Sequence, residues 1–382
     1  MMCAAASNAL KTGFVWHELY MWHDTGTYAG VLPSGHGILE PEENTENAAT
    51  KRRIKNLMDV SGITEQLHLI KPRAASEVEL RLVHSADYIA AIQDMSANGG
   101  GDARMDTPWG HTPFGPGGFE IAALAAGGVL EAVDAVIDRT VANAYALVRP
   151  IGHHAEPDRG LGFCMFNNGA IAARHALQHK GLERIAMVDW DVHHGNGAQK
   201  IFWEEANVLT ISIHQDRVFP PDGRGGVDEA GGGQGEGYNL NIPLPPGSGE
   251  GAYIAAFERL VVPALLQFRP DLIIVPSGFD GGAFDTLGRM MLHSGAFRQM
   301  TRMMMDVADE TCGGRLLLCH EGGYHKASTP FFGLAVIEEL SGIKTDIEDP
   351  WMPIFAGIGQ QELQPHQDAL IASLEPRLQS IG

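Results

Sequence analysis

Apolar residues along the chain fall into short runs that alternate with longer stretches at helical spacing. Short runs of aliphatic residues predict strands, and apolar positions that recur every three or four residues predict helices. The predicted strands cover residues 12–17, 142–148, 185–189, 208–213, 238–242, 272–276 and 315–320. The first predicted helix begins between residues 45 and 50 and ends near 62; the others cover 77–95, 119–138, 167–178, 198–205, 252–268, 296–311 and 331–341.

From residue 142 onward, strands and helices alternate, which favours right-handed crossovers and a mostly parallel sheet. The pattern therefore predicts an α/β fold with helices on both faces of the sheet. Segments 24–47 and 97–118 are rich in glycine and proline and are expected to be long loops, which in compact domains are often functional. No internal repeat or linker is visible, so we predict a single domain over residues 1–382.

Composition narrows the function classes. The chain has 27 basic and 47 acidic residues and a net charge of −20, which argues against binding to nucleic-acid phosphates. Its four cysteines form no CxxC pair, a usage typical of a reduced cytosolic protein. The N-terminal residues do not show a signal-peptide pattern, and no apolar run reaches the length expected of a membrane span. We therefore expect a cytoplasmic protein that binds neither nucleic acid nor membrane.

The densest chemistry lies at residues 189–197, Asp-Trp-Asp-Val-His-His-Gly-Asn-Gly, at the end of the predicted strand 185–189. Carboxylates and imidazoles grouped this closely are typical of a divalent-metal site. In an extended segment Asp191 and His193 point to one side, and Asp189 shares that side one step back. The spacing predicts two metal ligands with a carboxylate behind them.

Three other predicted strands also end in polar loops, at residues 149–155, 277–282 and 320–324. Because ligands bind outside the carboxyl ends of parallel strands, we expect the four loops to meet at one edge of the sheet. Asp280 stands among glycines and would complete an open site with Asp191 and His193, which leaves room for water and a substrate carbonyl. Taken alone, Asp280 would more simply be a helix cap or a turn residue.

The adjacent pair His153 and His154 follows a glycine at the end of strand 142–148. Two histidines beside a metal site are candidates for a general base and a general acid. Asp189 and Asn196 are natural partners for them, and because only the Asp adds charge, the two imidazoles should differ in basicity. Tyr324 could donate its O–H to an oxyanion, although a single tyrosine is more often a half-buried aromatic.

Five motifs follow one another in order. They are Arg-Pro-Ile-Gly-His-His-Ala at 149–155, Gly-Phe-Cys at 162–164, the 189–197 segment, Ser-Gly-Phe-Asp at 277–280 and Glu-Gly-Gly-Tyr at 321–324. Each motif alone is weak, but five in order are specific. Together they resemble the histone deacetylase and acetylpolyamine amidohydrolase family, most closely its bacterial class II branch of histone deacetylase-like amidohydrolases. The resemblance covers nearly the whole chain.

The resemblance implies the arginase/deacetylase fold, with an eight-stranded parallel sheet and one catalytic zinc. The implied zinc ligands are Asp191, His193 and Asp280. The implied catalytic residues are His153, His154, Tyr324, Asp189 and Asn196. Two aromatic walls of a narrow substrate tunnel fall on Phe163 and Phe219. Structural potassium is implied at an inner site (Asp189, Asp191, His193, Ser212 and Ile213) and at an outer site (Phe202, Glu205, Val208 and Tyr238), the outer one largely through backbone carbonyls.

The activity implied by the resemblance is zinc-dependent hydrolysis of an acetyl or other acyl amide on a lysine-like amine. His154 would be the main proton shuttle, His153 its electrostatic support, and Tyr324 a donor to the oxyanion. The substrate stays open between acetylated lysine, an acetylated polyamine and another small amide. Because family members are often dimers or tetramers, we also expect a homo-oligomer.

Two other function classes are alternatives to an amidohydrolase. A binuclear manganese ureohydrolase of the arginase type shares the fold, but it needs an Asp two residues beyond Asp280, where this chain has Gly282. A non-catalytic protein that binds acylated amines would not need the complete set of site residues. The chain also departs from many relatives at Ile151 and around Gly281 and Thr286, which indicates an altered pocket floor.

Overall fold

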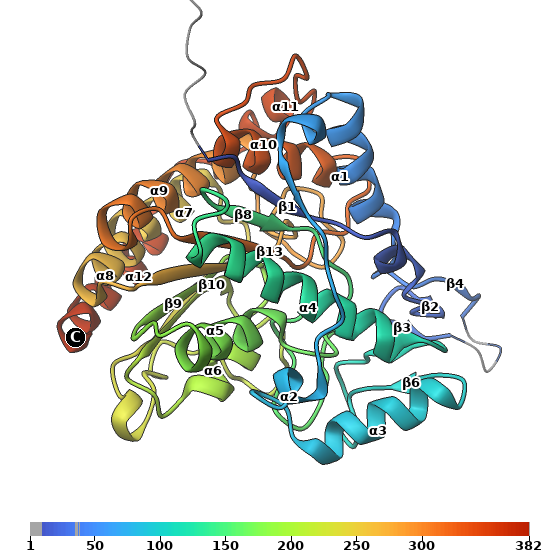
Figure 1. The fold of residues 1–382 in the computed structure, drawn as a ribbon. Helices are drawn as coiled ribbons and strands as arrows, with labels where there is room; N and C mark the ends of the chain where they lie inside the picture. Colours follow the sequence, from blue (N-terminus) through green and yellow to red (C-terminus); the bar gives the residue numbers. More distant parts are fainter. Residues whose placement is uncertain (1–9, 35–36, 38, 382) are drawn as a thin grey trace, which may run out of the picture.

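The computed structural model describes residues 10–34, 37 and 39–381 and is built around an eight-stranded sheet (Figure 1). The strand order is β11-β10-β9-β12-β13-β8-β1-β5, and every pair of neighbours is parallel. The strands are β1 (Gly13–Val15), β5 (His68–Ile70), β8 (Ala144–Ala146), β9 (Ile185–Asp189), β10 (Val208–Gln215), β11 (Asn239–Leu244), β12 (Leu272–Ser277) and β13 (Leu316–His320). The predicted α/β fold is confirmed.

Helices cover both faces of the sheet (Figure 1). One face packs against α4 (Gly118–Ile137), α5 (Asn168–His179) and α6 (Asn196–Phe202). The other face packs against α1 (Ala49–Val60), α7 (Glu250–Ala256), α8 (Val262–Phe268), α9 (Ser294–Cys312) and α10 (Thr329–Ser341). Strand β9 shows the cause: Ala186 and Val188 face one core and Ile185 and Met187 the other, so the strand is apolar up to its last residue, Asp189.

Several predicted elements differ from the structure. The helix predicted at 77–95 is two helices, α2 (Glu77–Leu80) and α3 (Ala86–Ala97), because Ser85 accepts a hydrogen bond from the Tyr88 N–H and so begins a new helix. The helix predicted at 252–268 contains a π-helical turn at Phe257–Val261. The edge strand β5 was missed because it is only three residues long and Leu69 is exposed.

The two segments predicted as loops contain small antiparallel sheets. Residues 24–47 include β2 (Thr27–Ala29), β3 (Leu32–Pro33) and β4 (Glu42–Glu43), and residues 97–118 include β6 (Gly101–Asp102) and β7 (Pro113–Phe114). Beyond α10 the chain adds α11 (Met352–Ala356) and α12 (Pro365–Leu374), which the apolar pattern did not predict.

One helical stretch, Glu250–Phe268, is long and apolar enough to cross a membrane by length and composition alone. The expectation that no run reaches that length is therefore wrong. Of its most apolar 18 residues, 56% are buried inside the fold, and Tyr253, Phe257 and Leu260 belong to the main core. Helices in protein cores show the same composition, so we interpret the stretch as a core helix.

A buried arginine attaches the N-terminal segment to the sheet. Arg149, which follows β8, is 1% exposed and forms an ion pair with Glu46 at 2.9 Å. The same guanidinium donates to the backbone carbonyls of His23 at 2.5 Å and Tyr20 at 3.4 Å. Lys51 on α1 also lies 2.9 Å from Glu46. Burial alone would raise the pKa of Glu46, but the charges of Arg149 and Lys51 outweigh burial and lower that pKa to about 2.

We predict that Glu46→Gln lowers the free energy of unfolding at neutral pH by roughly 3 kcal/mol, because two buried cations lose their carboxylate. The pKa of this group rises from about 2 in the folded chain to 4.5 when unfolded, so its contribution is complete above pH 4.5 and is lost as the pH falls toward 2. Urea unfolding at several pH values should show the gap between wild type and Glu46→Gln closing over that range. Glu43→Gln, at an exposed carboxylate, is the control; a gap independent of pH would contradict the prediction.

Candidate active site

The four strands that end in polar loops are neighbours in the sheet. Their order is β9-β12-β13-β8, so the loops that follow them meet at one edge, as predicted. Asp189 ends β9, Ser277 ends β12 and His320 ends β13. The proposed metal ligands, the histidine pair and Tyr324 come from these four loops and are almost entirely buried.

Three predicted ligands lie together at this edge. Ligand atoms of Asp191, His193 and Asp280 all fall within 4.8 Å of one another. His193 Nδ1 lies 3.0 Å from Asp191 Oδ1 and 3.2 Å from Asp280 Oδ2. Asp280 Oδ2 is buried and accepts no hydrogen bond from the residues that the structure describes. Buried carboxylates need a compensating positive charge, and one imidazole with two carboxylates is a donor set suited to zinc. The residues therefore fit a divalent metal ion.

Glycines create the space for these carboxylates. A Cβ at Gly322 would lie 2.0 Å from Asp280 Oδ2 and 2.8 Å from Asp191 Oδ2, and one at Gly278 would lie 2.1 Å from Asp191 Oδ2. The Gly322 N–H also donates to Asp191 Oδ2 at 2.8 Å. Any side chain at these positions would displace a carboxylate, which explains the glycines in the two motifs.

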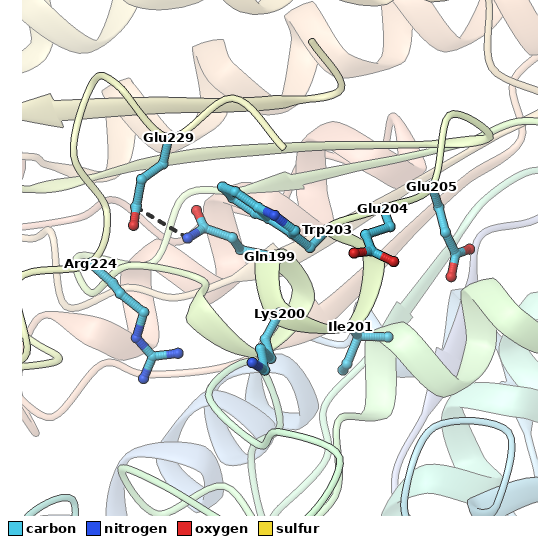
Figure 2. Close-up of a pocket in the computed structure, with 8 residues that line it drawn as sticks. All are labelled: Gln199, Lys200, Ile201, Trp203, Glu204, Glu205, Arg224 and Glu229. Atoms are coloured by element: carbon cyan, nitrogen blue, oxygen red, sulfur yellow. Dashed lines mark hydrogen bonds between the residues drawn. The ribbon is translucent and has the colours of Figure 1, made fainter. Parts of the chain in front are cut away.

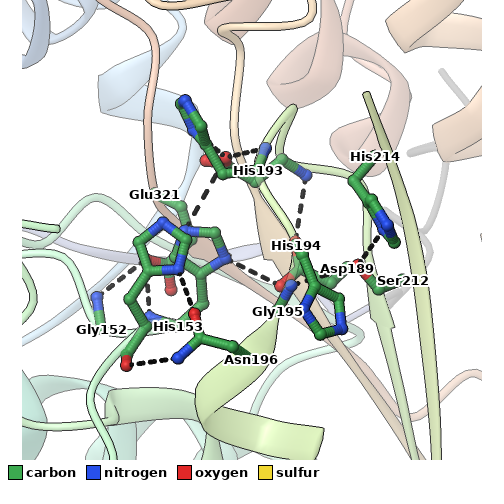
Figure 3. A network of polar contacts seen from close by, with 12 residues as sticks. Gly152, His153, Asp189, His193, His194, Gly195, Asn196, Ser212, His214 and Glu321 are labelled. Atoms are coloured by element: carbon green, nitrogen blue, oxygen red, sulfur yellow. Dashed lines mark hydrogen bonds and ion pairs between the residues drawn. The ribbon is translucent and has the colours of Figure 1, made fainter. Parts of the chain in front are cut away.

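The two histidines are each held by the partner expected from the sequence, and Figure 3 shows His153 beside Asp189. His153 Nδ1 lies 2.9 Å from Asp189 Oδ2, and His154 Nδ1 lies 2.6 Å from Asn196 Oδ1. Asn196 Nδ2 donates to the His154 carbonyl at 3.1 Å and to Glu156 Oε1 at 3.1 Å, so its oxygen faces the imidazole. The hydrogen of His154 therefore sits on Nδ1, and its Nε2 is left as an acceptor.

The two imidazoles differ in basicity. Burial would lower the pKa of His153, but the carboxylates of Asp191 and Asp189 outweigh burial and raise that pKa well above its usual value. For His154, burial and then the charges of His153 and His193 lower the pKa well below its usual value. One ring is thus biased toward the imidazolium and the other toward the neutral form, although the ring centroids are only 3.8 Å apart.

A cavity of about 350 Å³ borders the site. Its lining joins the site residues His154, His193 and Tyr324 to apolar side chains from distant loops, namely Val31, Leu32, Trp109, Phe163, Phe219 and Leu287. The Phe219 ring lies 4.7 Å from His154, and the Phe163 ring lies 6.3 Å from Tyr324. No carboxylate lines this cavity among the residues that the structure describes. Both segments predicted as long loops thus contribute to it.

Three supporting carboxylates were not predicted, because their roles depend on contacts that are distant in sequence. Glu321 Oε2 accepts from the N–H of Gly152 at 2.7 Å and of His153 at 3.1 Å. Asp285 Oδ2 accepts from the Tyr324 N–H at 2.7 Å. Glu321 belongs to a motif that the sequence made visible, but its partners could not be read from it. Glu46, which pairs with Arg149 and Lys51, is the third.

The predicted potassium residues are also placed by the structure. Asp189 and Ser212 lie side by side on β9 and β10, in register. The Glu205 carboxylate is paired with Arg174, so only its backbone carbonyl is left for an outer site. Glu205 also borders a separate surface cavity of about 470 Å³, in which Gln199 donates to Glu229 at 3.1 Å (Figure 2). Potassium binding at either site stays a prediction.

Comparison with known proteins decides the family. A model of the histone deacetylase domain matches residues 44–340. The chain belongs to the histone deacetylase family. This family member is 48% identical over 342 residues to a histone deacetylase-like amidohydrolase from Pseudomonas aeruginosa. The matched region covers 89% of this chain and 88% of that protein. The resemblance inferred from the motifs is therefore confirmed, and membership implies hydrolase activity.

Two further comparisons add to this. The deacetylase-family chain is 40% identical over 286 residues to polyamine deacetylase HDAC10 from Homo sapiens, a match covering 74% of this chain and 42% of that protein. It superposes on the crystal structure of the HDA15 HD domain with a TM-score of 0.82 at 29% identity, over 97% of this chain and 98% of that one. The arginase/deacetylase fold predicted from the sequence is confirmed.

We predict that Gly322→Ala weakens zinc binding about tenfold or more, because the added Cβ displaces the carboxylates of Asp280 and Asp191. Zinc affinity measured by competition with a chelator checks this. Gly281→Ala, where the nearest atom to the added Cβ is Leu292 Cδ1 at 3.3 Å, is the matched control and should retain wild-type affinity. Equal affinity of the Gly322→Ala variant and wild type would show that these carboxylates do not hold the metal.

Proposed function

We propose that the protein is a zinc-dependent amidohydrolase that removes acetyl or other acyl groups from lysine-like amines. The observation that carries the proposal is one apolar cavity bordered by an open set of metal ligands, a histidine pair of unequal basicity and a buried tyrosine. Asp191, His193 and Asp280 would hold the zinc. When bound there, zinc polarises a substrate carbonyl and lowers the pKa of a water molecule to about 7.

His154 acts as the main proton shuttle in this proposal. Its Nε2 accepts a proton from the attacking water and later returns it to the departing amine, while Asn196 keeps the other ring nitrogen protonated. His153, held toward the imidazolium by Asp189, supplies positive charge beside the developing oxyanion.

Tyr324 donates its O–H to the substrate oxygen as negative charge develops there. Burial, followed by the charges of Asp280 and Asp191, raises the pKa of Tyr324 well above its usual value, so the phenol keeps its proton. Asp285 holds the backbone of this residue in place through the Tyr324 N–H. Phe163 and Phe219 flank the apolar part of the cavity and exclude water from the reacting amide.

The cavity lining supports an acyl-lysine substrate over a polyamine. A lysine side chain presents uncharged methylenes to the cavity, whereas a polyamine carries further ammonium groups that would need carboxylates near them. The described lining residues include none. The alternative is an acetylpolyamine or another small amide, hydrolysed by the same residues, and the similarity to a protein named polyamine deacetylase keeps it open.

The proposal also includes four properties expected from the sequence. The chain forms one catalytic domain, binds potassium, assembles into a homo-oligomer and is located in the cytoplasm. A non-catalytic binding protein is a weaker candidate, because the described site combines all of the predicted ligands, histidines and the tyrosine.

We predict that Tyr324→Phe lowers kcat about a hundredfold or more, because the oxyanion loses one hydrogen-bond donor. Zinc content should stay unchanged, since Tyr324 is not among the proposed ligands. Tyr28→Phe removes a phenol whose ring lies 5.8 Å from His111 and is the matched control, with turnover near wild type. Near-normal turnover of Tyr324→Phe would refute the role of this tyrosine.

We predict that acetyl-lysine peptides and longer acyl-lysine peptides are hydrolysed with a higher kcat/KM than acetylated polyamines. The measurement is a panel of these substrates and small unrelated amides with zinc-loaded protein, each repeated with Tyr324→Phe. A preference for polyamines would keep the proposed mechanism and reassign the substrate; tyrosine-independent cleavage would contradict the mechanism itself.

A further inference from the structure

A buried lysine lies behind the proposed oxyanion donor. Lys51 on α1 is 0% exposed, and its ammonium lies over the ring of Tyr324, 5.2 Å from the ring centroid. Tyr324 borders the active-site cavity, whereas Lys51 is not among the residues that line it. The lysine thus contacts the tyrosine from the protein side, outside the space available to substrate.

The charges around Lys51 do not cancel. Its ammonium has Glu46 Oε1 at 2.9 Å, but Arg149 pairs with the same carboxylate at 2.9 Å. Two buried cations therefore share one carboxylate among the described contacts. The nearby His23 and His320 do not offset the extra positive charge. Burial and then the charge of Arg149 lower the pKa of His23 below its usual value, and burial and then the charge of Lys51 lower the pKa of His320. Both imidazoles are therefore neutral.

A buried cation without its own carboxylate lowers the stability of the fold unless another group stabilises its charge. An ammonium in a dry interior gains more from an aromatic face than one in water does. Among the described residues the Lys51 ammonium has no acceptor besides its ion-pair partner Glu46, and the Tyr324 ring is the further electron-rich group that it contacts. A cation held over an aromatic face is attracted electrostatically by the ring, which favours one position of the ring.

We propose that Lys51 is a positioning residue for the oxyanion step: its ammonium holds the Tyr324 ring and makes the phenol O–H a stronger hydrogen-bond donor. This inference rests on the proposed function, because it assigns Lys51 an effect that operates through Tyr324. It predicts that Lys51 matters for kcat much more than for KM, since the contact strengthens a hydrogen bond that forms as charge develops.

The test is a double-mutant cycle on the zinc-loaded protein. Lys51→Met keeps the length of the side chain without its charge and leaves Glu46 paired one to one with Arg149. We expect Lys51→Met to lower kcat roughly tenfold, the order of effect of one desolvated cation–π contact, with KM nearly unchanged. In the Tyr324→Phe background the same substitution should change kcat less than twofold. An equal loss in both backgrounds would overturn the proposal.

Lys55→Met is the matched control. Lys55 lies one turn further along α1, and its ammonium is 6.0 Å from the ring centroid of Trp16, away from the site. This variant should keep wild-type kcat. Thermal unfolding of each variant separates loss of fold from loss of function, and Lys51→Gln replaces Lys51→Met if the latter does not fold. Lys51→Arg, which retains the charge, should recover part of the lost kcat, and a charge-independent loss would contradict the proposal.

A binding measurement separates this inference from the proposed function. A small hydroxamate, which binds zinc and presents a carbonyl oxygen to Tyr324, is titrated by calorimetry into the same four proteins of the cycle. Lys51→Met should lower the affinity for the hydroxamate, and this difference in affinity should disappear in the Tyr324→Phe background. That result supports the inference even if no amide is turned over. Turnover that depends on Tyr324 but not on Lys51, with unchanged hydroxamate affinity, keeps the proposed function and rejects the inference.

Discussion

Uncompensated negative charge at the carboxyl ends of β9 and β12 is the constraint on which the site depends. Asp189, Asp191 and Asp280 are buried within a few ångströms of the imidazoles, where water cannot solvate them. Hydrogen-bond donors partly compensate this charge: His153 contacts Asp189, and backbone N–H groups donate to Asp191 and Asp280. Glycines allow these groups to approach the carboxylates. Among the described residues, one carboxylate oxygen of Asp280 still accepts no hydrogen bond, and a cation would satisfy it.

The same charge arrangement separates the roles of the two histidines. Both rings are buried and nearly in contact, yet Asp189 beside one and Asn196 beside the other bias them toward different protonation states. On the other side of the cavity lining, Lys51 brings positive charge close to Tyr324, and Arg149 shares its carboxylate partner Glu46. The carboxylates, the histidines and the cations thus form one electrostatic unit, built from strand ends and from the helix that follows the N-terminal segment.

The sequence predicted the parts of this unit that lie at strand ends. Strand β9 was identified because four apolar residues precede Asp189, the first residue of the 189–197 segment. The histidine pair was identified because His153 and His154 are adjacent in the sequence. Lys51 and Glu46 were not predicted, because the contact between Glu46 and Arg149 joins residues 103 positions apart and no local pattern encodes it. The two loops that line the cavity were recognised as loops, but the position of Trp109 required the fold.

The proposed hydrolysis requires one divalent metal ion, held by Asp191, His193 and Asp280. The most direct measurement is metal content per chain, by mass spectrometry of the intact protein, followed by activity as zinc is returned to the stripped protein. We expect one tightly bound zinc per chain and activity that rises in proportion to it. Two catalytic metal ions per chain, or full activity of the stripped protein, would rule out a single required zinc.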